Sequence, residues 1–436
     1  MPLFRLSPRF CKTKKIYFYA QIINLHLYFM KRNSINHLRN AAIIACLLIS
    51  ILANAQWPQW RGINGDGIST ETNLLKTWPA EGPKLLWSSD TIGWGWGSPS
   101  IENNIIYVVG RKDSTEYLLA LDINGKLLWQ TAIGRNWNFG KWIDARCTPT
   151  IYKNKAYTVT GFGDIACVDC KTGKSDWAFR GFEKFEGKGN AQFGMSENPI
   201  VMDDKVFLTT GGYKTSIVAL NRLTGETIWM SESLKDSAEF TTPALVVNKD
   251  KRVIVGGTKK KSFAVDFNTG KIVWTGEGNL GFVPTAYKNQ VYFAGAKKGG
   301  KLLTFNEDLT SCSIQWEDTI KANNMGASVI IGNKIYTTID SRKSGLASID
   351  LATGKVLHIN EAIKPSSIIG TKDMLYCFDN KSGKICLVKI NENSTELVSS
   401  FKVPFGKGPF FIAHMIIVNG VLYVRQDKYL MAFGIK

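Results

Sequence analysis

Short runs of apolar residues, rich in β-branched and aromatic side chains, recur along most of the chain with turn-forming residues between them. Runs of this kind are typical of β-strands. Asn104 and Asp203 stand where a first strand would turn into a second, and Gly125 and Gly173 stand before a last strand, where a positive φ favours glycine. The pattern therefore predicts antiparallel strands joined by tight turns.

One unit of four such strands repeats along the chain. Several copies open on proline, as in SPSI, TPTI and NPIV, and after a turn of the Thr-Gly-Lys type each ends on a strand that closes with tryptophan. The closing residues are Trp129, Trp177, Trp229, Trp274 and Trp316, at intervals of 42–52 residues. A four-stranded repeat of this length is typical of a β-propeller blade. We interpret each indole as a structural wedge between neighbouring blades.

The number of repeats predicts how the ring closes. Seven units lie between Ser98 and Val403, and an eighth at the C-terminus has three strands. Pro83–Asp90 supplies a lone strand that ends on the same residue type, Trp87, and pairing it with the last unit removes two open sheet edges. The sequence therefore predicts an all-β fold: an eight-bladed β-propeller of four-stranded antiparallel blades over residues 83–436, closed by an N-terminal strand and preceded by an extension over residues 56–82.

The first 55 residues have the layout of a secretory signal peptide. An apolar run, Ala41–Leu52, follows basic residues and precedes a small-x-small pattern that predicts cleavage after Ala55, with Met30 as the true start. Few apolar residues precede Cys46, so soluble export is favoured over a lipid anchor at that cysteine. No later apolar run is long enough for a transmembrane helix. We expect a periplasmic or extracellular protein.

The net charge does not indicate a nucleic-acid partner. The formal charge of +18 includes eight Lys/Arg and no Asp/Glu in residues 1–55, which leaves +10 for the remaining chain. That excess is moderate and spread along the sequence. We expect no nucleic-acid binding.

The repeat resembles a known family. Pro-opening strands, Ala-Leu-Asp, Thr-Gly-Lys and the closing tryptophan, with the opening WPQWRGINGDGIS of Trp57–Ser69, resemble the pyrroloquinoline-quinone (PQQ)-like propeller repeats of exported bacterial proteins. These repeats occur in quinoprotein alcohol dehydrogenases and in an outer-membrane assembly lipoprotein. The enzyme branch implies PQQ, calcium, a catalytic Asp and, in alcohol oxidation, two adjacent cysteines. The chain has no Cys-Cys dipeptide, so no cofactor is predicted, and PQQ with calcium belongs to the alternative function alone.

The sequence offers few residues for any other catalytic or metal-binding site. The chain after residue 55 has two histidines, His358 at a blade-closing position and His414 in an apolar strand. Cys167 and Cys170 lie on a strand-like stretch whose pattern favours core positions over a metal or redox pair. Asp66 lies between two glycines, which favours a turn over a calcium ligand. We predict no catalytic residues and no metal site, and we do not expect an enzyme.

Three long loops between predicted blades carry the candidate ligand residues. They span residues 93–97, 134–146 and 181–197, and such loops gather at one end of a propeller channel. The candidates are Trp94, Trp96, Arg135, Trp137, Phe139, Trp142, Asp144 and Arg146. Aromatic and arginine side chains suit recognition of sugars or peptides, although the tryptophans could instead close the channel mouth as a packed cluster. The leading hypothesis is a monomeric, non-catalytic binding or scaffold module for a protein or carbohydrate ligand at the channel face. The alternative is a PQQ-dependent alcohol or polymer dehydrogenase.

Two cysteines fall on a predicted hairpin. If its turn centres between Lys381 and Ser382, Cys377 lies directly opposite Cys386. Opposed residues of a hairpin are close enough for a disulfide, and an exported protein meets oxidising conditions. We predict a possible disulfide, with two reduced thiols packed on one face as the other outcome.

Overall fold

The computed structural model describes residues 56–140, 142–277, 283–295, 299–322, 326–340, 344–408 and 410–436. The predicted signal peptide, with Met30, Cys46 and the cleavage point after Ala55, lies outside these ranges. Within them no helix is long and apolar enough to cross a membrane. In these ranges the short helix α2 (Gly181–Phe185) lies among segments that are otherwise built of strands and turns.

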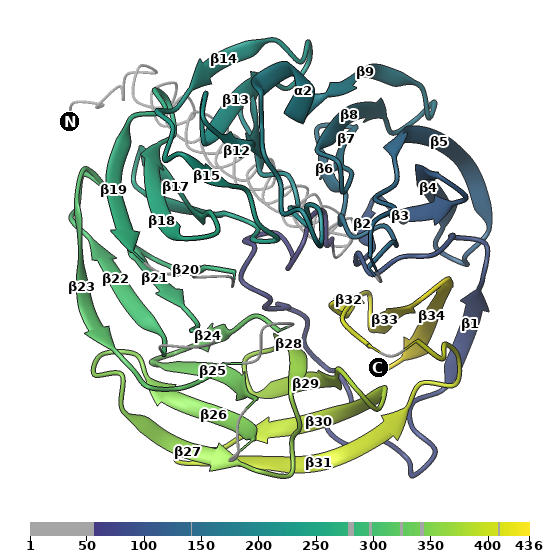
Figure 1. Ribbon diagram of the computed structural model, residues 1–436. Helices are drawn as coiled ribbons and strands as arrows, with labels where there is room; N and C mark the ends of the chain where they lie inside the picture. Colours follow the sequence, from purple (N-terminus) through teal and green to yellow (C-terminus); the bar gives the residue numbers. More distant parts are fainter. Residues whose placement is uncertain are drawn as a thin grey trace, which may run out of the picture. The chain divides into compact units, whose positions relative to one another are not determined.

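Eight four-stranded antiparallel sheets succeed one another around a ring in the described chain, which confirms the predicted fold (Figure 1). Blade 1 has β2 (Ser100–Glu102), β3 (Ile105–Lys112), β4 (Thr115–Asp122) and β5 (Leu127–Arg135); blade 2 has β6 (Thr150–Tyr152), β7 (Lys155–Val159), β8 (Asp164–Asp169) and β9 (Ser175–Arg180). Blade 3 has β10 (Val201–Met202), β11 (Lys205–Thr209), β13 (Ile217–Asn221) and β14 (Thr227–Met230); blade 4 has β16 (Ala244–Asn248), β17 (Lys251–Gly257), β18 (Lys261–Asp266) and β19 (Ile272–Glu277). Blade 5 has β20 (Thr285–Tyr287), β21 (Gln290–Phe293), β22 (Lys301–Phe305) and β23 (Cys312–Glu317); blade 6 has β24 (Val329–Ile331), β25 (Lys334–Ile339), β26 (Gly345–Asp350) and β27 (Val356–Asn360). Blade 7 has β28 (Ser366–Gly370), β29 (Met374–Asp379), β30 (Lys384–Ile390) and β31 (Thr395–Lys402). A two-stranded ladder of β12 (Gly211–Gly212) and β15 (Asp236–Ser237) lies beside blade 3.

Blade 8 joins the two ends of the propeller. Its strands are β32 (Ile416–Val418), β33 (Val421–Gln426), β34 (Tyr429–Gly434) and the N-terminal β1 (Leu85–Ser89). β1 runs antiparallel to β34, with Leu85 opposite Phe433 and Ser88 opposite Met431. The predicted closure by an N-terminal strand is therefore confirmed.

A closing tryptophan and a turn glycine meet between neighbouring blades. Gly173 has a φ of +70°, and a Cβ there would lie 2.8 Å from the ring of Trp129 in the preceding blade. Trp129 also donates its indole N–H to the carbonyl of Cys170, at 3.2 Å. The same ring-over-glycine contact joins Trp87 to Gly125, Trp177 to Gly225, Trp229 to Gly270 and Trp316 to Gly354. Trp274 packs instead on a cluster that includes Leu309, whose own φ is +54°. The glycine of the repeat is thus required both by its turn and by the indole that covers it.

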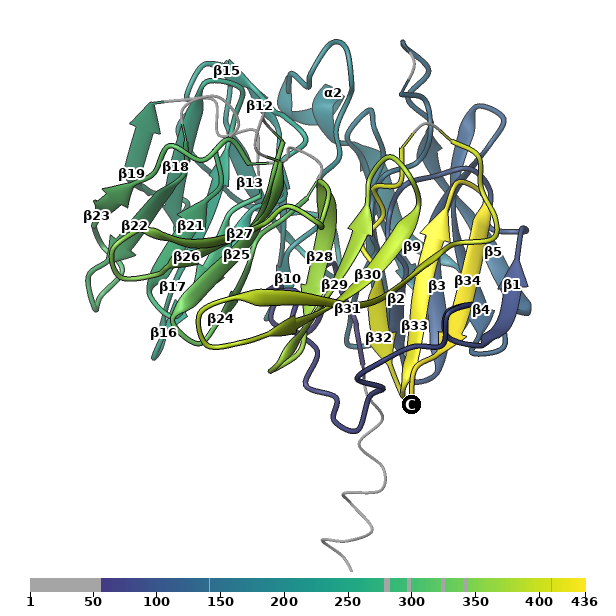
Figure 2. The same cartoon turned by 90° about the horizontal axis from the view of Figure 1, so that it is seen from below.

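The extension, residues 56–82, crosses the centre of the ring on one face (Figures 1 and 2). Its backbone pairs with blade 1 through Trp57, whose N–H donates to the carbonyl of Ile101 at 2.8 Å. Farther along, Ser69 N–H donates to Gly370 O of blade 7, and Leu75 N–H donates to Ile435 O after β34, both at 2.8 Å. The extension therefore connects blades that are distant in the sequence.

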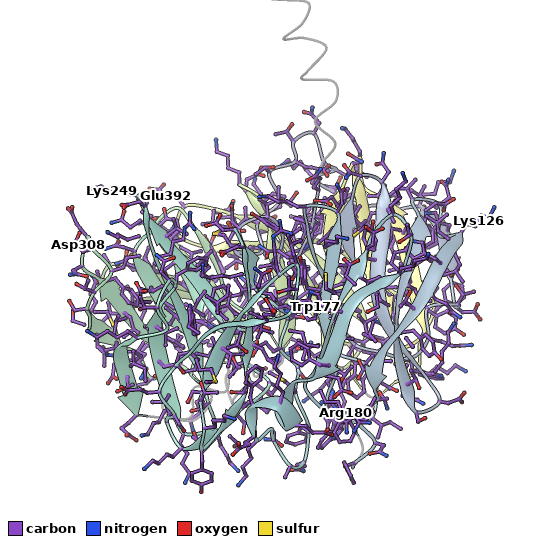
Figure 3. The ribbon with its side chains drawn as sticks, turned by 90° about the horizontal axis from the view of Figure 1, so that it is seen from above. Lys126, Trp177, Arg180, Lys249, Asp308 and Glu392 are labelled. Carbon is purple, nitrogen blue, oxygen red and sulfur yellow. The ribbon has the colours of Figure 1, made fainter. Side chains whose placement is uncertain are left out.

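We call this side the turn face and the opposite side the loop face. Figure 2 shows α2, β12 and β15 on the loop face, away from the extension. In Figure 3 the hairpin residues Lys126, Lys249, Asp308 and Glu392 lie at the turn face, whereas Arg180 lies toward the loop face.

The cysteines are buried or half-buried thiols in the described chain. Cys377 lies directly opposite Cys386 in the β29–β30 register, which is the pairing that the hairpin predicts. Burial raises the pKa of both thiols. Cys167 and Cys170 lie in two different hydrophobic clusters.

Candidate ligand-binding site in the channel

A cavity of about 250 Å³ occupies the channel. Its wall is formed by inner-strand ends of successive blades, by the loops between blades and by one residue of the extension, Trp60. Three of the eight ligand candidates line it: Trp96, Trp142 and Arg146. The cavity is therefore the place where sequence-distant loops and the extension meet.

Five residues that the sequence did not identify as candidates form a ring around this cavity. These residues immediately precede the blade-opening prolines of five successive blades, and they are Ser98, Thr148, Asn198, Thr242 and Val283. A residue before proline is held in extended conformation, which gives each blade the same backbone at this point. In the sequence these residues share one feature, their position before the blade-opening proline. That position also lies just before each inner strand, so it did not by itself indicate a cavity.

Hydrogen bonds join four members of this ring. Ser98 N–H donates to Thr148 Oγ1 at 3.0 Å, and Thr148 N–H donates to Asn198 Oδ1 at 2.6 Å. Asn198 N–H in turn donates to Thr242 Oγ1 at 3.1 Å. Each buried backbone donor of one blade is thus satisfied by a side chain of the next. The ring holds blades 1 to 4 together and lines the cavity with hydroxyl and amide groups.

Aromatic side chains from four loops form the wall on one side. Trp96 and Trp142 meet edge to face with ring centroids 5.0 Å apart. The ring centroids of Trp142 and Phe193 are 6.2 Å apart, and those of Phe193 and Phe240 are 6.1 Å apart. Phe410 stacks on Trp142, with a distance of 4.8 Å between the ring centroids. The packed-cluster alternative is therefore partly correct, because the rings contact one another, yet Trp96, Trp142, Phe193 and Phe240 still line an open cavity.

Glycines position the Trp96 loop. A Cβ at Gly95 would collide with the guanidinium of Arg425, and a Cβ at Gly97 would collide with the carbonyl of Cys147. Arg425 is fully buried and donates to Val109 O at 2.6 Å and to Gly97 O at 2.9 Å. The small residues allow the loop to lie directly on blade 8, and this contact fixes Trp96.

The extension supplies the floor of the cavity. Trp60 and His414 meet with ring centroids 5.1 Å apart, and both line the cavity. Arg61 is fully buried beneath them and donates to Asp66 O at 2.6 Å and to Ser328 O of blade 6. Burial, with a smaller effect from the charge of Arg61, lowers the pKa of His414 to about 3. His414 is therefore neutral at physiological pH, and its Nδ1 has no hydrogen-bond partner in the part of the chain that the structure describes.

Arg146 brings the positive charge to the wall. Its guanidinium lies 5.7 Å from the Trp96 ring centroid and donates to the carbonyl of Trp142. Burial lowers the pKa of Arg146 to about 10, so it remains protonated at neutral pH. Glu116 is buried close by, and burial raises its pKa to about 8, against the opposing effect of Arg146. Its Oε1 accepts from Gly161 N–H at 3.3 Å.

Five of the predicted ligand residues lie outside the cavity: Trp94, Arg135, Trp137, Phe139 and Asp144. Arg135 pairs with Asp164 at 2.6 Å, and Asp144 pairs with Arg111 at 2.9 Å. These ion pairs fasten the loop of residues 134–146 to blades 1 and 2.

The aromatic members of this group differ in exposure. Trp137 is 9% exposed, between Phe139 and Phe162, with centroid distances of 5.1 and 4.9 Å. Trp94 and Phe139 are exposed on the surface. They are available to a partner but do not shape the cavity.

The cavity lining does not suit the calcium-bound quinone of the alternative function. Calcium takes six to eight oxygen ligands, commonly including carboxylates. The described lining contains Arg146 and His414 but no carboxylate, and the described residues contain no cluster of three His, Cys, Asp or Glu that could hold a metal. Asp66 is used in its own turn, where Oδ1 accepts from Ile68 N–H at 2.9 Å. The residues present do not fit this cofactor set.

Comparisons with known proteins agree with the fold. A family model described as outer membrane protein assembly factor BamB matches residues 114–360. Among solved structures, BamB from Moraxella catarrhalis is 16% identical with a TM-score of 0.59, over 81% of this chain and 98% of that one. A europium-containing methanol dehydrogenase is 13% identical with a TM-score of 0.64, over 85% and 89%. A quinohemoprotein alcohol dehydrogenase from Comamonas testosteroni is 14% identical with a TM-score of 0.60, over 87% and 80%. No curated protein matches the sequence.

Proposed function

Because the chain belongs to the family of the outer membrane protein assembly factor BamB, we propose that it is an exported, non-catalytic binding module. It acts as a monomer and holds a protein or carbohydrate ligand in the channel cavity. Export rests on the layout of residues 1–55, in which basic residues, an apolar run and a small-x-small pattern follow one another.

The observation that carries this proposal is the composition of the cavity wall. Aromatic rings from the loops face a ring of hydroxyl and amide side chains, and Arg146 adds one positive charge. Apolar walls with a few convergent polar groups are typical of ligand sites. The described wall holds no carboxylate to serve as a general acid or base, and His414 is neutral with a pKa of about 3. Binding is therefore better supported than catalysis.

The name of the family supports a role toward other proteins. Trp94 and Phe139, which are 43% and 54% exposed and lie outside the cavity lining, would offer contacts to a partner protein. A partner could insert a side chain or an attached sugar into the cavity.

Ligand screening with matched variants tests the proposal. Purified protein is applied to a glycan array and to a peptide array, and hits are measured by calorimetry. We expect Trp142→Ala to weaken binding at least 10-fold, because aromatic anchors carry much of the energy of a site. Tyr213→Ala, which changes an exposed aromatic residue outside the cavity lining, serves as the control. Binding that is insensitive to Trp142 or absent for every ligand would overturn the proposal.

The second candidate is a PQQ-dependent alcohol or polymer dehydrogenase. The observation in its favour is likeness of fold to the methanol dehydrogenase, with a TM-score of 0.64. Protein incubated with PQQ and calcium is assayed for dye reduction with alcohols and polymeric alcohols. Saturable turnover would replace the binding proposal, whereas we expect none above the rate without protein.

A further inference from the structure

The cavity contains nitrogen groups whose hydrogen-bonding capacity is unused. Nη1 of Arg146 and Nδ1 of His414 are buried and have no hydrogen-bond partner among the described residues, and both residues line the cavity. Beneath the floor, Nη1 of the fully buried Arg61 also has no partner. Buried polar atoms are normally paired, and unpaired ones are costly. At the cavity wall Arg146 requires an acceptor, whereas Nδ1 of the neutral His414 can pair with a hydroxyl group in either tautomer. A ligand that carries both an acceptor and hydroxyl groups would remove the cost at these two residues.

The carboxyl near Arg146 does not provide the missing acceptor. Oε1 of Glu116 is used by the N–H of Gly161, and Oε2 has no partner. Glu116 and Asp144 lie close enough to act on the charge of Arg146, but neither is among the residues that line the cavity in the described chain. A guanidinium binds a carboxylate with strong, charge-assisted hydrogen bonds. The missing partner of Arg146 is therefore best supplied by an anion.

The rest of the wall suits the ring and hydroxyls of a sugar. Thr148 and Thr242 accept backbone N–H groups through Oγ1, yet each keeps its own hydroxyl proton as a donor. Trp96 and Trp142 lie next to Arg146 and offer flat apolar surfaces. A cavity of about 250 Å³ is small for a ligand site, which favours one or two sugar rings over a longer segment.

We propose that the cavity selects a sugar that carries a carboxylate, the uronic-acid residue of an acidic glycan. Arg146 binds the carboxylate, the aromatic wall contacts the ring, and Thr148, Thr242 and His414 bind its hydroxyl groups. This inference rests on the proposed function and specifies its ligand class.

Calorimetry with three matched disaccharides tests the inference: digalacturonate, its methyl ester and neutral galactobiose. We expect the acid to bind at least 10-fold more tightly than the other two, because a charged hydrogen bond is lost with the ester. Arg146→Gln should abolish that preference while its residual affinity matches that of the ester for the wild type. Arg135→Gln, which changes an arginine of the same loop outside the cavity, should leave the preference intact.

A second variant keeps the test decisive if Arg146→Gln does not fold. His414→Phe preserves an aromatic ring at the floor and should weaken all three disaccharides about equally. Equal affinity of the acid and neutral sugars would overturn the inference and leave the proposed function standing. Benzoate binding as tightly as digalacturonate would overturn the sugar assignment. Binding of peptides alone would overturn it also, and the absence of any glycan or peptide ligand would remove the proposed function itself.

Discussion

Blades 1 to 4 and blades 6 to 8 are joined to their neighbours by different means. In the first group the repeat itself supplies the connections, as where Thr148 N–H donates to Asn198 Oδ1 across two blades. In the second group the extension supplies many of them: Arg61 donates to a carbonyl of blade 6, and Ser69 pairs with Gly370 of blade 7. Blades 1 and 2 also receive backbone hydrogen bonds from the extension, and blades 6 and 7 also bond directly through Ser366 and Thr338. The difference is that the ring of residues before proline joins the first group, whereas Arg61 and Ser69 of the extension add contacts to the second.

The closing positions show the same contrast. Trp229 is 9% exposed, covers Gly270 and donates to the carbonyl of Phe267 at 3.1 Å. Blade 6 has His358 at its closing position, and blade 7 has its turn glycine, Gly383, between its second and third strands, where Phe411 from the connection to blade 8 covers it. In the described chain, the contact of a closing tryptophan with a glycine between the third and fourth strands of the next blade is therefore not repeated at blade 7.

Truncation is the strongest way to test this comparison. Removing residues 1–82 eliminates the buried side chains of Trp57, Leu74 and Trp78, which are 3–7% exposed. At roughly 1.5–3 kcal/mol for each buried side chain, we expect a loss of about 5 kcal/mol. Amide hydrogen exchange should rise first in blades 6 to 8. Truncation through Asp90 also removes β1 and should abolish cooperative unfolding.

Removal of residues 1–55 alone is the control and should leave the thermal midpoint unchanged. Equal midpoints for the truncations at 55 and 90 would contradict closure by β1. A uniform rise in exchange over all blades would contradict the special role of the extension.

The closing positions predict a smaller difference. Trp229→Ala should cost about 3–5 kcal/mol, because a large buried ring leaves a cavity between blades 3 and 4. His358→Ala should cost less than about 1 kcal/mol, because His358 is half-buried and has not replaced the tryptophan wedge. Urea unfolding measures both. Losses of similar size would show that His358 acts as a closing residue.

Buried carboxyls make blades 1 to 3 sensitive to pH. Burial raises the pKa of Glu116 and Glu197 to about 8, compared with roughly 4.3 in an unfolded chain. The folded state therefore binds more protons between these values, and the free energy of unfolding falls as pH rises from about 5 to 8. Glu197→Gln should make the free energy of unfolding less dependent on pH in this range. It should also stabilise the protein at pH 8 by on the order of 2 kcal/mol.

Thermal midpoints measured across this pH range check the effect. Glu361→Gln, at an exposed position between blades 6 and 7, should leave the fall unchanged. A wild-type protein whose midpoint rises from pH 5 to 8 would contradict the expected sign.

The hydrogen bonds in the ring of residues before proline should contribute to the free energy of unfolding. Asn198→Ala leaves the buried N–H of Thr148 without its acceptor and should cost about 2 kcal/mol. Val283→Ala, the equivalent change in blade 5, removes no hydrogen bond of this ring and should cost roughly 1 kcal/mol or less. Chemical unfolding of both variants checks the difference, and equal costs would show that the ring is not held by its hydrogen bonds.

The smallest expected effect lies in blade 7. A disulfide between the opposed Cys377 and Cys386 would close a short loop and add at most about 2 kcal/mol to a blade whose covering ring comes from elsewhere. The structure has both residues as free thiols, so the bond would form only on oxidation. Peptide mapping under non-reducing conditions of protein from an oxidising compartment would then recover the linked pair. Two alkylatable thiols at these positions would rule the bond out.

The candidate site was predictable in part. The long loops carry unusual tryptophans, and this led to Trp96, Trp142 and Arg146, which line the cavity. Arg135 and Asp144 are charged residues of the same loop. Their ion pairs with Asp164 and Arg111 hold them outside the cavity. Sequence shows which side chains a loop carries, and the pairing of charges across blades decides which of them stay free.

The sequence by itself determined the strands, the number of blades and the closure by β1, because turn chemistry and the alternation of side chains are local and repeat with the blade. The tertiary structure alone decided that Trp60 and His414 form the floor of the cavity and that Phe411 covers Gly383. Trp60 and His414 are far apart in the chain, and no local pattern relates them. Their contact depends on the path of the extension across the finished ring, which exists only once the eight blades have closed.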